Sequence, residues 1–446
     1  MSKEKCFPDN FIWGVSTAAA QIESASSIDG RGVSNWDEMP RIGAVYQNQT
    51  MDDGCDHYHH YKEDIKLMAE LGVKAYRFSI SWNRILPNGL GKINEKGLQF
   101  YDDVIDELLK YGIEPYITLF HWDMPLDLLK EGGWLNNKSS DWFLEYVKVV
   151  ILRYKSKVKN WITINEPPCM MIFGGVEFGR KYTTKETLQI VHNILLAHGK
   201  AARFIKDNNL NVGIAVCSTT YAPIDDKEEN IEAARIANFD IIRDDIWGIA
   251  LWDDPIMLGD YNKKYYEIYT DEERPNITKE DLELISTPLD FYGHNIYHGA
   301  PVKTDGKGGY IILNHSVGNP KTCMDWDIYP KIMYWAPKYI YERYHVPFFI
   351  TENGCAVTDI LTSDKRIHDA PRIEYLKQYL ANYRKAYEDG VDIRGYFLWS
   401  FMDNFEWREG YSKRFGIVYV NYQTKERIKK DSYYYYQEVI KNNREE

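Results

Sequence analysis

The 446-residue chain has no long uninterrupted apolar run. No stretch approaches the roughly 18 uncharged apolar residues that a membrane-spanning helix requires. The first ten residues, MSKEKCFPDN, contain no apolar segment of the kind found in secretory signal peptides. We therefore expect neither a membrane partner nor a signal peptide.

Cysteine is scarce and irregularly spaced. The chain has six cysteines, with no C-x-x-C pair and no regular framework. A chain of this length buries a large core and needs no disulfides for stability. The scattered thiols are typical of a reducing compartment, so we expect a cytoplasmic protein.

An excess of positive charge is also missing. The 54 Lys and Arg residues are outnumbered by 66 Asp and Glu residues, which gives a formal net charge of −12. Nucleic acids bind clustered Lys and Arg side chains through their phosphates, so we expect no nucleic-acid partner. The sequence contains neither G-x-G-x-x-G nor G-x-x-x-x-G-K-[ST], the glycine-rich loops that bind nucleotide phosphates. We expect no cofactor.

Aromatic residues, by contrast, are abundant, with 13 Trp and 35 Tyr. Most of them are expected in the core. The others are suited to line a cleft, where flat aromatic faces pack against sugars, nucleobases or aromatic ligands.

Short β-type runs alternate along the chain with longer helix-type segments. Several runs are apolar at both odd and even positions, as expected of parallel strands buried on both faces. The eight runs are 11–19, 75–82, 114–120, 160–166, 211–221, 289–297, 347–354 and 395–404. Eight such runs without a linker predict one α/β domain over residues 1–446, a (β/α)₈ TIM barrel. A doubly wound open sheet is the alternative, but it would usually bring a glycine-rich phosphate loop.

Helical periodicity separates the runs. Apolar residues recur at helical spacing in 98–112, where Gly112 is a plausible end, and tyrosines do so in 375–390. The connections 222–288 and 298–346 are longer than one crossover helix needs. We therefore expect extended loops at the C-terminal face of the strands.

Seven of the eight runs end in, or are followed by, polar or aromatic side chains; the run 211–221 offers no obvious candidate. In this barrel class active sites lie at the C-terminal ends of the strands. Glu166 ends the run ITINE, and Glu352 ends the run FITE. A single carboxylate at such a position is most often a helix cap or a loop ion pair. Two of them on runs four and seven, nearly opposite in a barrel of eight, could approach to roughly 5 Å.

Such a pair fits glycoside hydrolysis. One carboxyl must be protonated to donate to the leaving oxygen, and the other must be ionised to attack the anomeric carbon. Burial and mutual repulsion separate their pKa values.

The cluster CDHYHHY, which contains Cys55, His57, His59 and His60, raises a metal-binding alternative. Its spacing matches neither H-E-x-x-H nor paired C-x-x-C motifs. We interpret these residues as structural and expect no metal site. Cys169 and Cys355, each three residues beyond a candidate glutamate, are interpreted as packing residues, because the sequence places no histidine base beside them.

Motifs along nearly the whole chain resemble glycoside hydrolase family 1. They are FPDNFIWGVSTAAAQIE (7–23), DHYHHYKEDIKLMAELGVKAYRFSISWNRILPNG (56–89), GIEPYITLFHWDMPLDLL (112–129), TINEP (163–167), ITENG (350–354), LWSFMDNFEW (398–407) and KKDSYYYYQEVI (429–440). The ordered pair TINEP and ITENG is highly specific.

This resemblance implies a retaining, exo-acting β-glucosidase acting on short oligosaccharides or on aryl and alkyl β-glucosides. Glu166 resembles the family's acid/base and Glu352 its nucleophile, while Arg77 and Tyr297 resemble the pair that supports the nucleophile. The residues similar to the family's substrate-binding set are Gln21, His121, Asn165, Asn295, Tyr297, Trp326, Trp399, Glu406 and Trp407.

Glu406 also bears on the choice of sugar. The family's 6-phospho-glycosidases replace this glutamate, and a carboxylate would repel a 6-phosphate. The resemblance therefore favours unphosphorylated β-glucosides, with β-galactosides and β-fucosides as alternatives. Ser24, Pro168, Lys331 and the segment 177–184 depart from the family pattern. We expect most of them near the aglycone side.

Two other functions are left open. The altered segment 177–184 could make transglycosylation the main reaction. A non-catalytic sugar-binding protein on the same barrel would have lost one of the two glutamates, and both are present. The sequence gives no indication of oligomeric state.

Overall fold

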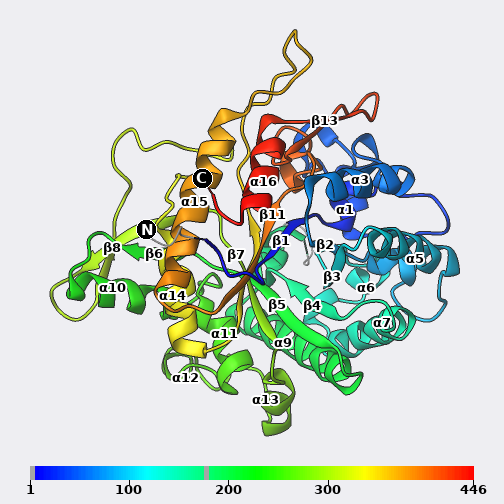
Figure 1. The fold of residues 1–446 in the computed structure, drawn as a ribbon. Coiled ribbons are helices and arrows are strands. Elements are labelled where there is room, and N and C mark those ends of the chain that lie inside the picture. Colours follow the sequence, from blue (N-terminus) through cyan, green and yellow to red (C-terminus); the bar gives the residue numbers. More distant parts are fainter. Residues whose placement is uncertain (1–5, 175–179, 446) are drawn as a thin grey trace.

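Eight parallel strands close into a barrel in the computed structural model, which describes residues 6–174 and 180–445. The strands are β1 (Ile12–Ser16), β2 (Ala75–Ser79), β3 (Glu114–Phe120), β4 (Asn160–Asn165), β5 (Asn211–Cys217), β7 (Phe291–Asn295), β10 (Phe348–Asn353) and β11 (Ile393–Trp399). Their order around the barrel follows the chain, and β11 closes against β1 (Figure 1). Each of the eight predicted runs overlaps one barrel strand, which confirms the predicted TIM barrel.

Long helices surround the barrel (Figure 1). They are α3 (His57–Leu71), α5 (Glu95–Lys110), α7 (Ser139–Tyr154), α9 (Thr184–Asp207), α14 (Ile332–Tyr344), α15 (Ala370–Glu388) and α16 (Asp431–Asn442). The two predicted helices correspond to α5 and α15. In α15, Tyr375, Tyr379 and Tyr383 are buried at successive four-residue spacings, whereas Tyr387 is 39% exposed because the stripe drifts off the packed face.

Additional elements lie in the long connections and after the strand ends. The segment 222–288 contains α10 (Glu228–Phe239), α11 (Ile249–Leu258), α12 (Lys263–Ile268) and α13 (Lys279–Ile285). A small sheet combines β6 (Thr220–Pro223), β8 (Gly299–Thr304) and β9 (Tyr310–Ile312), and a hairpin pairs β12 (Val418–Val420) with β13 (Arg427–Lys429). Short helices are α1 (Ala19–Ile22), α2 (Asn35–Glu38), α4 (Trp82–Ile85), α6 (Leu126–Lys130) and α8 (Pro167–Cys169). Single turns are η1 (Tyr46–Asn48), η2 (Met51–Asp53), η3 (Gly133–Leu135), η4 (Met170–Gly174) and η5 (Trp407–Glu409).

Seven of the eight barrel strands end before the corresponding predicted run does, most clearly β1, β2, β5 and β11, because the chain turns at the barrel rim. β1 stops at Ser16 and α1 follows it, while β2 stops at Ser79 before α4. The run 211–221 divides into β5 and β6, and β6 pairs with β8 outside the barrel. Apolar composition continues past each turn since the rim is also buried, so composition could not mark the ends.

An apolar layer fills the barrel interior. It takes one side chain from each of seven strands, namely Ala75, Tyr116, Ile162, Ala215, Phe291, Phe349 and Phe397, with Ile12 of β1 beside them. This layer makes the barrel a packed core and not a pore. It leaves only the C-terminal rim of the strands for a binding site.

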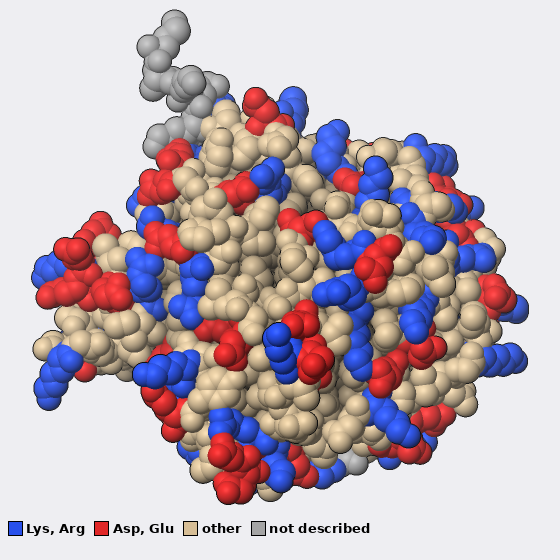
Figure 2. All heavy atoms as spheres, turned by 90° about the horizontal axis from the view of Figure 1, so that it is seen from below, with Lys and Arg blue, Asp and Glu red and all other residues tan. Residues whose placement is uncertain are grey.

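The surface carries both signs of charge. On the face drawn in Figure 2, Lys and Arg side chains alternate with Asp and Glu, and neither sign forms a continuous field. Within residues 6–174 and 180–445, no helix combines the length and the apolar character needed to cross a bilayer.

Candidate active site

A cavity of about 520 Å³ opens at the C-terminal ends of the barrel strands. Glu166 and Glu352 both line it. It is also lined by His121, Asn295, Tyr297, Trp326, Trp399, Glu406 and Trp407 from the predicted substrate-binding set. Three predicted residues are buried and lie outside this lining, namely Gln21, Asn165 and Arg77. Arg77 and Asn165 contact residues that line the cavity, as described below.

The backbone departs from regular strand geometry where it presents both glutamates. The register between β4 and β5 shifts between Ile162 and Asn165, and that between β10 and β7 shifts between Ile350 and Glu352. Such bulges re-aim side chains at barrel rims. Glu166 has φ of 44°, Trp122 has 77° and Trp407 has 50°. Three non-glycine residues in the left-handed region are strained, and all three line this cavity.

The Glu352 carboxyl is bound on both oxygens. Arg77 Nη1 donates to Oε1 over 2.6 Å, and the Tyr297 hydroxyl donates to Oε2 over 2.6 Å. Burial raises the pKa of Glu352, whereas the Arg77 charge and these hydrogen bonds oppose that rise. The two donors stabilise the ionised form, which suits a nucleophile.

Glu166 lies in a different environment. Its Oε1 accepts a hydrogen bond from Asn295 Nδ2 over 2.9 Å. Burial, followed by the negative charge of Glu352, raises the pKa of Glu166 to about 8. The Glu166 carboxyl therefore keeps its proton at neutral pH, which suits a general acid.

Asn165 turns inward, against strict strand alternation. Ile162 belongs to the interior layer, so regular alternation would direct Asn165 out of the barrel. The register shift in β4 reverses this. The Asn165 Oδ1 accepts from Arg77 Nη2 over 2.6 Å and from Asn295 Nδ2 over 3.1 Å. Asn165 thus links the groups that hold Glu352 to those that hold Glu166.

Three buried polar atoms of the predicted set have no hydrogen-bond partner within the described residues. They are Gln21 Oε1, His121 Nδ1 and Glu406 Oε2. Leaving a buried polar atom unsatisfied is costly. His121 and Glu406 line the cavity, so their unsatisfied atoms indicate ligand contacts, whereas Gln21 lies outside the lining. The Gln21 amide is oriented by donating to the Phe405 carbonyl over 2.8 Å. Hydroxyl groups of a sugar in the cavity can satisfy the His121 and Glu406 atoms, because a hydroxyl both donates and accepts.

Aromatic rings form part of the cavity wall. The His121 ring stacks at 5.9 Å on Trp399 and also at 5.9 Å on Trp407. Trp326 contacts the Tyr297 ring at 5.4 Å between centroids. These faces are suited to the C–H surfaces of a pyranose.

Several lining residues were not predicted from the sequence. Cys217 ends β5, the one run without an apparent candidate, and Ser218 and Thr219 follow it. The other unpredicted lining residues are Trp122, Trp247, His298, Met324, Arg408, Glu409 and Phe415. The aromatic HWD segment after β3 could have indicated Trp122. Cys169 packs against the hydrophobic core, as predicted, and it also lines the cavity beside Glu166 and Cys217.

The histidine cluster near residue 57 has a structural role. His57 is buried, and its Nδ1 lies 2.7 Å from Asp64, which also binds Arg427. His59 and His60 pair on the surface with Asp56 and Glu63. Across the described residues, the only side-chain group with metal-ligand geometry is Glu166, Cys169 and Cys217.

Three of the departures from the family pattern fall on described residues outside the cavity lining. Ser24, Pro168 and Lys331 do not line the cavity. Their expected place near the aglycone side stays a prediction. Ser24 has φ of 57°, a conformation that favours glycine, and its hydroxyl bonds to the Met51 carbonyl. Part of the segment 177–184 lies outside the described residues, and Thr183 caps α9.

Comparisons with known proteins agree with this geometry. Residues 3–445 match the family model of glycosyl hydrolase family 1. Beta-glucosidase A of Thermotoga maritima is 44% identical, over 98% of each chain. The 1,4-beta-D-glucan glucohydrolase of Thermotoga neapolitana is 42% identical, over 98% of this chain and 99% of the relative. The solved beta-glucosidase of Thermotoga maritima in complex with glucoimidazole superposes with a TM-score of 0.89 at 43% identity, covering 99% of both chains.

Proposed function

The chain belongs to glycosyl hydrolase family 1, and we propose from this premise that it is a retaining, exo-acting β-glucosidase. Its substrates are terminal β-D-glucosyl residues of short oligosaccharides such as cellobiose, or of aryl and alkyl β-glucosides. We propose that residues 1–446 act as one catalytic domain, since strands from Ile12 to Trp399 close the same barrel.

One observation supports this proposal above the others, namely the unequal treatment of the two carboxyls. Glu352 receives a guanidinium and a phenolic hydroxyl, while Glu166 receives a neutral amide. Glu352 is therefore the better anion and Glu166 the better acid. Two carboxyls whose environments separate their pKa values are the arrangement that glycoside hydrolysis requires.

The two steps follow from these roles. Glu352 attacks the anomeric carbon while Glu166 donates its proton to the glycosidic oxygen, and the aglycone leaves as an alcohol. The Glu166 carboxylate then takes a proton from water, which attacks the same carbon and releases Glu352. Two inversions give net retention.

The sugar-binding groups support the exo mode. We propose that Gln21, His121, Glu406 and Trp407 bind the hydroxyls of the terminal glucose, with Trp399 as its platform. The unsatisfied Gln21, His121 and Glu406 atoms are the acceptors or donors for those hydroxyls. Asn165 and Asn295 hold the two carboxyls and contact the sugar, and Trp326 packs against the aglycone.

β-Galactosides and β-fucosides are the alternative sugars, and dominant transglycosylation is the alternative outcome of the second step. We further propose that the protein acts in the cytoplasm, because all six cysteines are free thiols.

The first experiment compares wild type and Glu352→Ala for release of nitrophenolate from p-nitrophenyl β-D-glucopyranoside. Turnover by wild type alone supports the reaction class and the nucleophile together. No turnover by wild type on the β-glucoside, β-galactoside or β-fucoside would contradict the proposal. Comparable turnover by Glu352→Ala would contradict the assigned nucleophile.

A further inference from the structure

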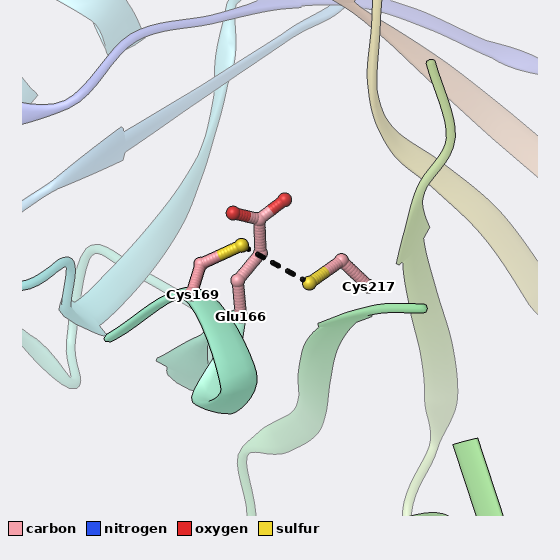
Figure 3. Close-up of side chains that lie close together, drawn as sticks. All are labelled: Glu166, Cys169 and Cys217. Atoms are coloured by element: carbon pink, nitrogen blue, oxygen red, sulfur yellow. Dashed lines mark hydrogen bonds between the residues drawn. The ribbon is translucent and has the colours of Figure 1, made fainter. Parts of the chain in front are cut away.

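Two thiols and a carboxyl meet at one point of the cavity wall. Cys169 lies in α8, three residues after Glu166, and this spacing places both side chains on the same side of the turn. Cys217 comes from the end of β5. Figure 3 shows the two sulfur atoms directed toward each other below the Glu166 carboxyl. The sulfurs are 3.5 Å apart, and the ligand atoms of all three residues lie within 4.8 Å of one another.

This geometry suits a metal ion better than a disulfide. A disulfide would require the sulfurs to approach to about 2.05 Å. Two thiolates at about 2.3 Å from a tetrahedral zinc ion lie about 3.8 Å apart, which is close to the separation here. Thiolate ligands select soft d¹⁰ cations, and one carboxylate completes a three-ligand set with the fourth position open.

We propose that Cys169, Cys217 and Glu166 form an inhibitory site for thiophilic d¹⁰ cations such as Zn²⁺ and Cd²⁺. All three residues line the cavity, so an ion that enters with solvent can reach them. Binding exchanges the two thiol protons and the Glu166 carboxyl proton for one divalent cation, and three protons pass to solvent. The resulting complex carries one net negative charge.

Inhibition follows from the identity of the third ligand, and this consequence rests on the proposed function. The Glu166 oxygens that deliver the proton to the leaving group are the oxygens that would bind the ion. A coordinated carboxylate can neither hold that proton nor accept one from water. Both steps of the reaction are therefore blocked while the ion is bound.

The test titrates the protein with CdCl₂ and follows two signals. Sulfur-to-cadmium charge-transfer absorption reports binding whether or not the protein is active, and nitrophenolate release reports inhibition. We expect absorption to saturate at one equivalent, activity to fall in parallel, and EDTA to reverse both. Each variant is compared with its own rate in the absence of cadmium.

Cys169→Ser and Cys217→Ser should each weaken cadmium binding at least about 100-fold, since loss of even an outer-shell partner costs 10- to 100-fold. Cys323→Ser is the matched control, because Cys323 is an exposed thiol outside the cavity lining. It should retain both signals. Cys217→Ala provides a second variant if serine at this buried position prevents folding.

Cadmium binding as strong as that of wild type in both Cys217→Ser and Cys217→Ala would overturn the site. Saturation of the thiolate absorption without loss of hydrolysis would overturn its inhibitory role. Absence of glycosidase activity in metal-free wild type would instead contradict the proposed function, and the absorption titration would still test the site.

Discussion

The Arg77 guanidinium lies 2.6 Å from the Glu352 carboxyl, from Nη1 to Oε1, and both side chains are buried. Arginine does not lose its charge in proteins, so it favours the carboxylate form of Glu352 whatever the pH. The remaining Glu352 oxygen is held by Tyr297. The nucleophile is thus stabilised by one permanent charge and by one hydrogen bond that a conservative substitution can remove.

Tyr297→Phe removes that hydrogen bond and retains the ring. We expect kcat/KM to fall by roughly 10- to 100-fold, because hydrogen bonds to charged groups contribute about 1.5–3 kcal/mol. The Tyr297 hydroxyl lowers the pKa of Glu352. Its loss should raise that pKa and move the acidic limb of the kcat/KM profile to higher pH. An unshifted limb would contradict the contact. Tyr310→Phe, which loses a hydrogen bond to Asp240 outside the cavity lining, is the control.

The basic limb of the kcat/KM profile should report Glu166. Because its pKa is raised to about 8, the carboxyl keeps its proton below that pH and loses it above. Activity should therefore decline as the pH rises through about 8, since only the protonated form can donate to the leaving oxygen. With a dinitrophenyl glucoside, whose leaving group needs no proton, Glu166→Ala should lack this limb. Persistence of the same limb in that variant would assign it to another group.

Glu166→Ala should also be rescued by azide. With an activated aryl glucoside the first step proceeds, and the glycosyl-enzyme accumulates because water lacks its base. Azide needs no base and fits the space left by the side chain, so turnover should increase with azide concentration. NMR of the product should show a β-glucosyl azide. An α-azide would exclude a two-step retaining reaction.

The preference for an unphosphorylated glucoside over its 6-phosphate should depend on pH, because the charge of Glu406 changes with pH. Burial and the charges of Glu352 and Glu166 raise the pKa of Glu406 to about 8. As the pH rises through this value the carboxyl ionises and repels a phosphate dianion. We expect the ratio of kcat/KM for p-nitrophenyl β-glucoside to that for its 6-phosphate to increase with pH. Titration of Glu166 and Glu352 should largely cancel in the ratio, because both act on both substrates.

Glu406→Gln is the variant that isolates this charge, since it keeps the shape and the hydrogen-bonding capacity of the side chain. Its ratio should stay flat over the same pH range, although its activity on the unphosphorylated glucoside should fall. A ratio in the variant that still climbs with pH would mean that another group repels the phosphate. Thermal unfolding of both proteins shows whether the substitution disturbs the fold.

The sequence by itself determined the barrel and the positions of both glutamates. The eight runs overlap all eight barrel strands, because burial on both faces requires continuous apolar segments that are visible locally. The rule that sites lie at the carboxyl ends of the strands then singled out Glu166 and Glu352, and both line the cavity.

Only the tertiary structure decided how these residues are oriented and which others join them. Alternation alone directs Asn165 out of the barrel, and the pairing of β4 with β5 turns it inward. Cys169 and Cys217 are 48 residues apart, yet their sulfurs lie 3.5 Å apart. Both results depend on how strands pair and where their ends meet. Local periodicity carries no information about contacts between segments that are distant along the chain.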